Sequence, residues 1–87
     1  MADTGRLPDN IMHFGRVLRA TGLPVGPGRV IEAVRAVEAA GIGSREDLYW
    51  TLHAVFVNRR DQRDLFDQAF HIFWRNPRIL ERAMSML

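Results

Sequence analysis

The segment DLYWTLHAVFV, residues 47–57, decides the fold, because it is apolar almost all round at helical spacing. After its first residue, only Thr51 and His53 are polar. A helix of this kind is covered on several sides and lies at the centre of a domain. Val55 and Val57 also allow a strand, but the sequence offers no second strand for pairing. We therefore expect residues 47–57 to form a central helix.

Helical periodicity and capping signals surround this segment. Ser44, followed three residues later by Asp47, is a capping-box pattern at the start of the central helix. Further helices are expected at about residues 9–21, 29–40, 61–74 and 76–87, with Asp61 and Asn76 as caps and Pro77 in a first helical position. Their predicted inward stripes are Ile11, Phe14, Val17 and Leu18; Val30, Ile31, Val34 and Val37; Phe66, Ala69, Phe70 and Phe73; and Ile79, Leu80, Ala83, Met84 and Leu87.

The segment TGLPVGPGRV, residues 21–30, separates the first two of these helices. A phosphate-binding loop would need a preceding strand and a terminal Gly-Lys-Ser/Thr, and neither is present. We interpret the segment as a rigid elbow in which Gly22 ends one helix in the left-handed region and Leu23 and Val25 enter the core. The alternative is an anion site at Gly28 and Arg29, where a helix begins.

Composition places the chain among small globular domains. Its 87 residues contain 47% apolar residues and no cysteine, which excludes disulfides and thiolate metal sites. All 12 basic residues are arginine, but ten acidic residues leave a net charge of only +2. No apolar run is long enough to span a membrane, and the first residues lack a secretory pattern, so we expect a cytoplasmic protein.

The fold prediction is therefore all-α, a compact bundle of about five short helices without a sheet. Residues 1–8 are expected to be a flexible tail, and residues 9–87 a single helical domain. Because the last stripe continues to the final residue, we interpret the chain as the N-terminal part of a longer protein.

No residue pattern indicates catalysis, a cofactor or a metal. Asp67 and His71 have a spacing that can hold a metal, but a surface ion pair or a solvated face is the simpler interpretation. His53 is expected to be a hydrogen-bonded core histidine, and His13 lies on the polar side of its helix. We therefore predict a non-enzymatic domain.

Two groups of residues are candidates for binding a partner. Arg59, Arg60 and Arg63 lie at a helix junction, where they either meet an acidic partner or cap the preceding helix and pair with neighbouring aspartates. Trp50 and Trp74 are either core residues or exposed interface anchors, since aromatic residues are enriched at interfaces.

Three motifs, GLPVGPGR, LYWTLHAVFVNRRDQ and FDQAFHIFW, carry a resemblance that covers residues 11–75. Together they are similar to the N-terminal helical region of CoxE-like proteins, which are bacterial and carry a von Willebrand factor A domain. The resemblance implies a MoxR-type AAA+ ATPase as partner, in the maturation of metalloenzymes such as carbon monoxide dehydrogenase. The family's metal-ion-dependent adhesion site needs a D-x-S-x-S run, which this chain lacks, so no metal-binding residue is carried over.

We therefore expect a helical adaptor whose partner is such an ATPase, the protein's own downstream von Willebrand factor A domain, or both. The alternative is a small nucleic-acid-binding module that uses the helices flanking AAGIGSRED, residues 39–47. Glu46 and Asp47 would then repel phosphate at the start of the recognition helix, which makes nucleic acid the weaker candidate.

Overall fold

The computed structural model describes residues 6–41 and 43–75, and within these ranges all regular secondary structure is helical. Its elements are α1 (Arg6–Thr21), α2 (Pro27–Ala40), α3 (Arg45–Phe56), the short 3-10 helix η2 (Arg60–Gln62) and α4 (Arg63–Phe73). The central segment is thus the helix α3, as predicted, and not a strand. The described part holds four α-helices, and the fifth predicted helix, over residues 76–87, lies outside it. No helix in the described ranges is long and apolar enough to cross a membrane.

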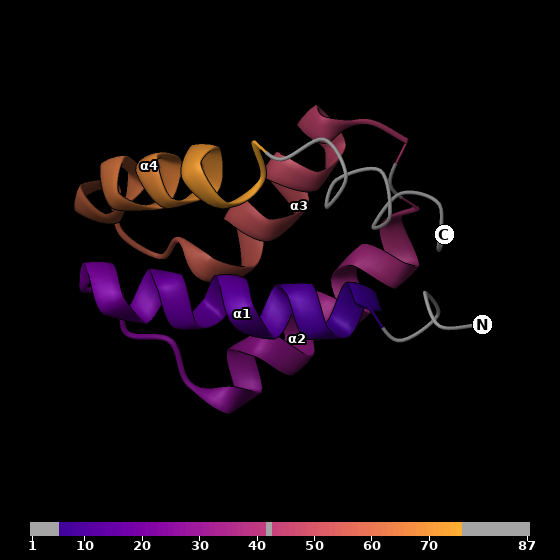
Figure 1. Ribbon diagram of the computed structural model, residues 1–87, viewed down its shortest axis with the longest axis horizontal. Helices are drawn as coiled ribbons and strands as arrows, with labels where there is room; N and C mark the ends of the chain where they lie inside the picture. Colours follow the sequence, from indigo (N-terminus) through magenta and orange to yellow (C-terminus); the bar gives the residue numbers. More distant parts are fainter. Residues whose placement is uncertain (1–5, 42, 76–87) are drawn as a thin grey trace.

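The helices form two packed pairs (Figure 1). Helices α1 and α4 lie side by side and run in opposite directions, and α2 packs along α3. Helix α1 also contacts α2, so it joins the two pairs. The apolar stripes of all four helices face the interior that this arrangement encloses.

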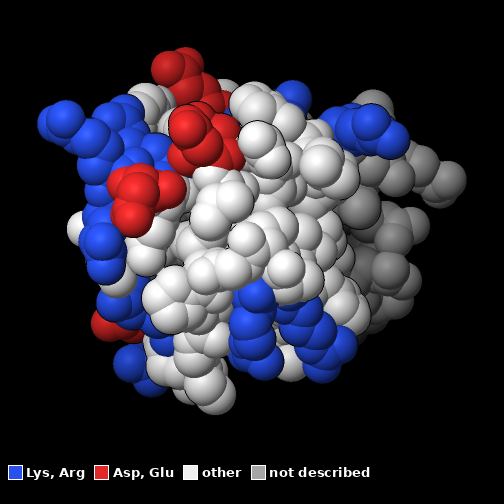
Figure 2. All heavy atoms as spheres, turned by 90° about the vertical axis from the view of Figure 1, so that its left-hand side faces the viewer, with Lys and Arg blue, Asp and Glu red and all other residues white. Residues whose placement is uncertain are grey.

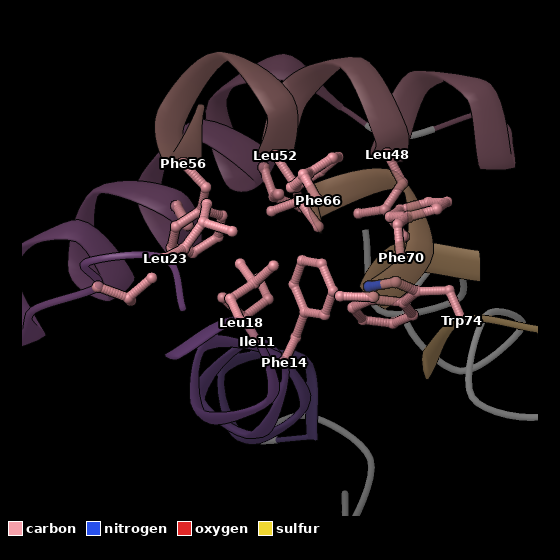
Figure 3. Close-up of a cluster of buried hydrophobic side chains, with 14 residues drawn as sticks. Ile11, Phe14, Leu18, Leu23, Leu48, Leu52, Phe56, Phe66, Phe70 and Trp74 are labelled. Atoms are coloured by element: carbon pink, nitrogen blue, oxygen red, sulfur yellow. The ribbon is translucent and has the colours of Figure 1, made fainter. Parts of the chain in front are cut away.

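Phe14 of α1 lies at the centre of that interior (Figure 3). Its ring centroid is 5.5–6.1 Å from those of five other aromatic residues, Phe56, Phe66, Phe70, Phe73 and Trp74. Most of these pairs are edge-to-face, an arrangement worth about 0.5–1.5 kcal/mol beyond the burial of the rings. The other core residues are Ile11, Leu18, Leu23, Val25, Ala33, Val37, Leu48, Leu52 and Ala69. A single aromatic ring thus contacts α3, α4 and the residue that ends α4.

The elbow between α1 and α2 has the predicted form. Gly22 has a φ of +112°, and its N–H donates to the carbonyl of Arg19. The N–H of Leu23 donates to the carbonyl of Leu18, which completes a Schellman motif with the expected apolar contact between these two leucines. Val25 is also buried, and its carbonyl accepts a hydrogen bond from Arg19 Nε at 3.1 Å.

Two helices begin earlier than the sequence predicted. Helix α1 starts at Arg6 rather than at Asp9, so part of the predicted tail over residues 1–8 is helical. Helix α2 starts at Pro27 rather than at Arg29, because proline fits the first helical turn, where its missing N–H has no partner to lose.

Three of the four residues predicted to face inward on α2 do so, but Ile31 does not. Ile31 is 52% exposed, whereas Ala33 is buried together with Val37. The buried face follows the spacing 30, 33, 34 and 37, with Val30 and Val34 partly buried. The small side chain of Ala33 did not stand out in the sequence, although it fits where helices pack closely.

The junction before α4 also differs from the prediction. Asp61 does not cap α4, because it lies inside η2. The side chain of Gln62 accepts hydrogen bonds from the N–H groups of Asn58 (2.9 Å) and Arg59 (3.2 Å). By contrast, the predicted cap of α3 is confirmed, since Ser44 Oγ accepts the N–H of Asp47 at 3.1 Å.

We predict that Gly22→Val destabilises the domain by about 1 kcal/mol or more, because a β-branched residue is strained in the left-handed region. The free energy of unfolding is measured by urea denaturation. Gly28→Val is the matched control, since Gly28 is an exposed helical residue with no atom within 4 Å of an added Cβ. Equal stability of the two variants would contradict the assigned role of Gly22.

We predict that Phe70→Ala costs about 3–5 kcal/mol, because it leaves a cavity beside Phe14. Ile72→Ala, on the same helix but 65% exposed, should change stability by only about 0.5 kcal/mol. Thermal unfolding followed by circular dichroism compares the two. A Phe70→Ala protein that melts like the parent would show that the face of α4 is assigned incorrectly.

Candidate protein-interaction surface

Arg59 and Arg60 lie on the turn between α3 and α4, Arg63 is the first residue of α4, and all three are exposed. We call these three residues the arginine junction. Helix α3 ends with the N–H of Val57 donating to the carbonyl of His53. The hydrogen bonds that the Gln62 side chain accepts, together with the 3-10 turn, then lead directly into α4. The junction is therefore held in a hydrogen-bonded turn and not in a long loop.

The sequence also allowed these arginines to cap α3 and to pair with neighbouring aspartates, and the structure supports this alternative only in part. Arg59 pairs with Asp61 at 3.3 Å, but both side chains are exposed, and surface pairs of this kind contribute little stability. The last turn of α3 is capped from another helix, since Arg29 Nη1 of α2 donates to the carbonyl of Val55 at 2.7 Å. Arg29 thus acts within the fold, which also argues against the alternative anion site at the elbow.

The two tryptophans have different roles. Trp74 is only 1% exposed and packs against Phe14, so its assignment as an interface anchor is wrong. Trp50 is 52% exposed on α3, which was predicted to be covered on several sides. Its ring lies 4.8 Å from that of Tyr49 and 5.4 Å from that of His53, in edge-to-face and tilted arrangements. Trp50 is therefore a fixed aromatic ring on the surface.

An open groove of about 450 Å³ runs beside Trp50 between α3 and α4. Its lining combines aromatic and charged side chains: Arg45, Glu46, Tyr49, Trp50, Asp67, Phe70 and His71. The guanidinium of Arg45 lies 5.4 Å from the centre of the Phe70 ring, within the range of a cation–π interaction. The groove thus has an aromatic floor and polar edges.

Pairs of polar side chains cross this groove at four-residue intervals. Arg45 approaches Nδ1 of His71 at 3.3 Å, and the hydroxyl of Tyr49 donates a short hydrogen bond to Asp67. One turn further on, the positive charge of Arg63 helps to lower the pKa of His53. Because the helices run in opposite directions, the spacing 45, 49, 53 on α3 matches 71, 67, 63 on α4. Arg63 lies one turn of α4 before Asp67, so the arginine junction adjoins the end of the groove that exposes Trp50.

The comparison with protein families agrees with this helical arrangement. The family model of the CoxE N-terminal helical bundle domain matches residues 11–77. The chain belongs to this family. No curated protein and no solved structure matches the chain. The match includes α2, α3, η2 and α4, and with them the groove and the arginine junction of this CoxE N-terminal domain.

Tyr49 is a strongly perturbed titratable group of the CoxE N-terminal domain. Its pKa is raised to about 12 by burial, by its hydrogen bond to Asp67 and by the negative charge of that carboxylate, while Arg63 acts in the opposite direction. The phenol thus keeps its proton at physiological pH and holds Asp67 against α3. This bond fixes the distance between the two helices on either side of the groove.

His53 was predicted to be a hydrogen-bonded core histidine, and the structure corrects this. The ring is partly buried between Tyr49, Trp50 and Phe66, but its buried Nε2 has no hydrogen-bond partner. Burial lowers the pKa of His53, and the positive charge of Arg63 adds to the effect, against the opposing influence of Asp67. Neutral His53 is therefore the form that fits the fold.

Asp67 and His71 do not form the metal pair that their spacing allows. Each instead contacts a side chain of α3, since Asp67 accepts from Tyr49 and His71 contacts Arg45. Within the described ranges, no group of three His, Asp or Glu side chains converges as metal ligands would. The groove is suited to binding by its aromatic surface and its exposed edges.

The sequence analysis missed the pairing of α3 with α4. Two series of residues at four-residue spacing could have pointed to this pairing. They are Arg45, Tyr49 and His53 in one helix and Arg63, Asp67 and His71 in the other. Spacing alone places each series on one face of its helix. It does not reveal that the two faces meet, because that depends on how the helices pack.

We predict that Tyr49 titrates near pH 12 in the folded domain, against 10 in the unfolded chain. Because the folded state holds this proton more tightly, its contribution to stability is complete below pH 10 and is lost as the pH rises towards 12. Tyr49 is the chain's single tyrosine, so tyrosinate absorbance measures it alone. Asp67→Asn should lower the pKa of Tyr49 because it removes the carboxylate charge, but the increase that burial causes should remain. A midpoint near 10 in the parent would contradict the buried hydrogen bond.

Proposed function

We propose that this CoxE N-terminal domain is a non-catalytic protein-interaction module. It would connect a CoxE-like protein to a MoxR-type AAA+ ATPase that assists the maturation of a metalloenzyme. The protein's own downstream von Willebrand factor A domain is a second possible partner of the same kind. The proposal rests on membership of the family together with the surface of the described helices.

One observation carries the proposal: Arg63 of the exposed arginine junction lies one turn of α4 before Asp67, which lines the groove that exposes Trp50. Arg59, Arg60 and Arg63 offer planar guanidinium groups that pair with carboxylates through two hydrogen bonds. Figure 2 views the end of the molecule where α1 ends and α4 begins, and basic side chains there lie both beside acidic ones and in groups without them. An acidic partner would thus meet the arginines at the edge and Trp50 nearer the centre, where aromatic anchors contribute most.

A binding role is also chemically simpler than catalysis at this groove. The polar groups that cross it are engaged with one another, as in the bond of Tyr49 to Asp67 and the contact of Arg45 with His71. The groove is open along its length, so it would exclude little water from a reaction. We therefore propose that the domain acts by docking and that the partner performs any chemistry.

Replacement of the arginine junction tests the proposed contact. The triple variant R59Q/R60Q/R63Q should associate with the MoxR-type ATPase about tenfold more slowly at low salt, because exposed charges act mainly on the association rate. The difference should shrink at high salt, where charges are screened. Surface plasmon resonance at two salt concentrations measures both rates, with the ATPase and the downstream domain immobilised in turn. Circular dichroism confirms that the variant is folded.

A second triple variant, A39E/Q68E/R75Q, is the matched control. It lowers the net charge by the same three units at exposed positions outside both the junction and the grooves. If it slows association as much as the junction variant, the effect comes from net charge and the assigned contact is wrong. Trp50→Ala should increase the dissociation rate from the same partner, since truncating an anchor weakens the formed complex.

A further inference from the structure

A second exposed surface lies between α1 and α2, away from the groove of α3 and α4. Two adjoining hollows of about 340 and 330 Å³ share Met12, Val30 and Ile31 in their linings. Met12 is 46% exposed and Ile31 52%, and the partly buried Val34 extends the apolar surface along α2. We call this surface the α1–α2 groove. Its centre is apolar, and contiguous exposed apolar surface with a polar rim is typical of interaction sites.

The floor of this groove is recessed because α1 and α2 approach closely at Gly15. A Cβ at this position would lie 3.0 Å from a methyl group of Val30 and 3.6 Å from one of Val25. The missing side chain therefore lowers the surface of α1 between Met12 and the elbow. The groove extends along α2 from Pro27 to Glu38, roughly 16 Å at the rise of an α-helix.

The rim of the groove is mostly basic. Arg16 and Arg19 of α1 and Arg35 of α2 line it, against the single acidic residue Glu38. Arg19 uses its Nε to bind the carbonyl of Val25, which fixes the direction of its side chain. An apolar floor about three helical turns long is thus bordered by arginines on both helices.

We propose that the α1–α2 groove binds an acidic amphipathic helix of a partner protein. Apolar side chains spaced along one face of such a helix would cover Met12, Val30 and Ile31. Its glutamates or aspartates would pair with the arginines of the rim. A second copy of this chain would bring two basic rims together, and a lipid surface would not reach a floor recessed between two helices.

This surface is separate from the contact proposed for the ATPase. The arginine junction lies where α3 ends and α4 begins, whereas the α1–α2 groove lies between α1 and α2. A domain with both surfaces holds two partners at once, as an adaptor requires.

Binding to a synthetic peptide tests the proposal on the 87-residue chain. The probe is a labelled three-turn helix with leucines along one face and glutamates elsewhere, and a second peptide carries lysines in place of the glutamates. We expect the acidic peptide to bind and the lysine peptide to bind at least tenfold more weakly, by fluorescence anisotropy at low salt. Amide chemical shifts should change around Met12, Ile31 and Val34.

Matched variants locate the site. Ile31→Ser should weaken binding of the acidic peptide about tenfold. Ile72→Ser, at another exposed isoleucine but on α4, should leave binding of the peptide unchanged. The double variant R16E/R35E should weaken binding of the acidic peptide at low salt, and by a smaller factor at high salt. R59Q/R60Q/R63Q should bind the peptide normally, so failure of this proposal is distinguishable from failure at the arginine junction.

Other occupants would give different results. Equal binding of the two peptides would overturn the role of the basic rim. Shift changes around Trp50 instead of Ile31 would place the site in the other groove. Sedimentation of the parent as a dimer and of Ile31→Ser as a monomer would assign the surface to a second copy. Ile31-dependent binding to phosphatidylserine vesicles without binding to the acidic peptide would assign it to a membrane.

Discussion

The packing of the Phe14 ring is the constraint on which the rest of the structure depends. Its contacts reach Phe56 at the end of α3, three phenylalanines of α4 and Trp74. A domain this small buries a limited share of its surface, so one well-packed cluster of rings accounts for much of its stability. The same cluster fixes α1 against both α3 and α4, and thereby sets the position of the groove between α3 and α4.

Aromatic side chains also explain why a groove remains between α3 and α4. Tyr49 lies against Phe66 and Phe70 with ring centroids 5.2–5.5 Å apart, so bulky rings fill the lower part of the space between the helices. The hydrogen bond from Tyr49 to Asp67 and the contact of Arg45 with His71 cross above them. Trp50 is left outside this set, fixed by its neighbours yet exposed, which is the arrangement expected of an interface anchor.

The charged groups act in two distinct ways. Arg29 and Arg19 bind backbone carbonyls at the end of α3 and in the elbow, and so belong to the fold. Arg59, Arg60 and Arg63 are exposed where α3 ends and α4 begins, while Arg16 and Arg35 border the α1–α2 groove. Composition alone shows twelve arginines of one chemical type. Only their positions separate those that hold helices together from those that are free to meet a partner.

The sequence by itself determined the helical class, the Ser44 cap, the left-handed Gly22 with the buried elbow, and the family, because these depend on local spacing and on motifs of a few residues. The tertiary structure alone decided which faces were covered. Trp74 is buried and Trp50 exposed, although both stand in apolar helical segments, and Ile31 is exposed while Ala33 is buried. The pairing of Tyr49 with Asp67, and of Arg29 with Val55, joins residues 18 and 26 positions apart. Such contacts follow from the way helices pack around Phe14, and periodicity within one helix carries no information about them.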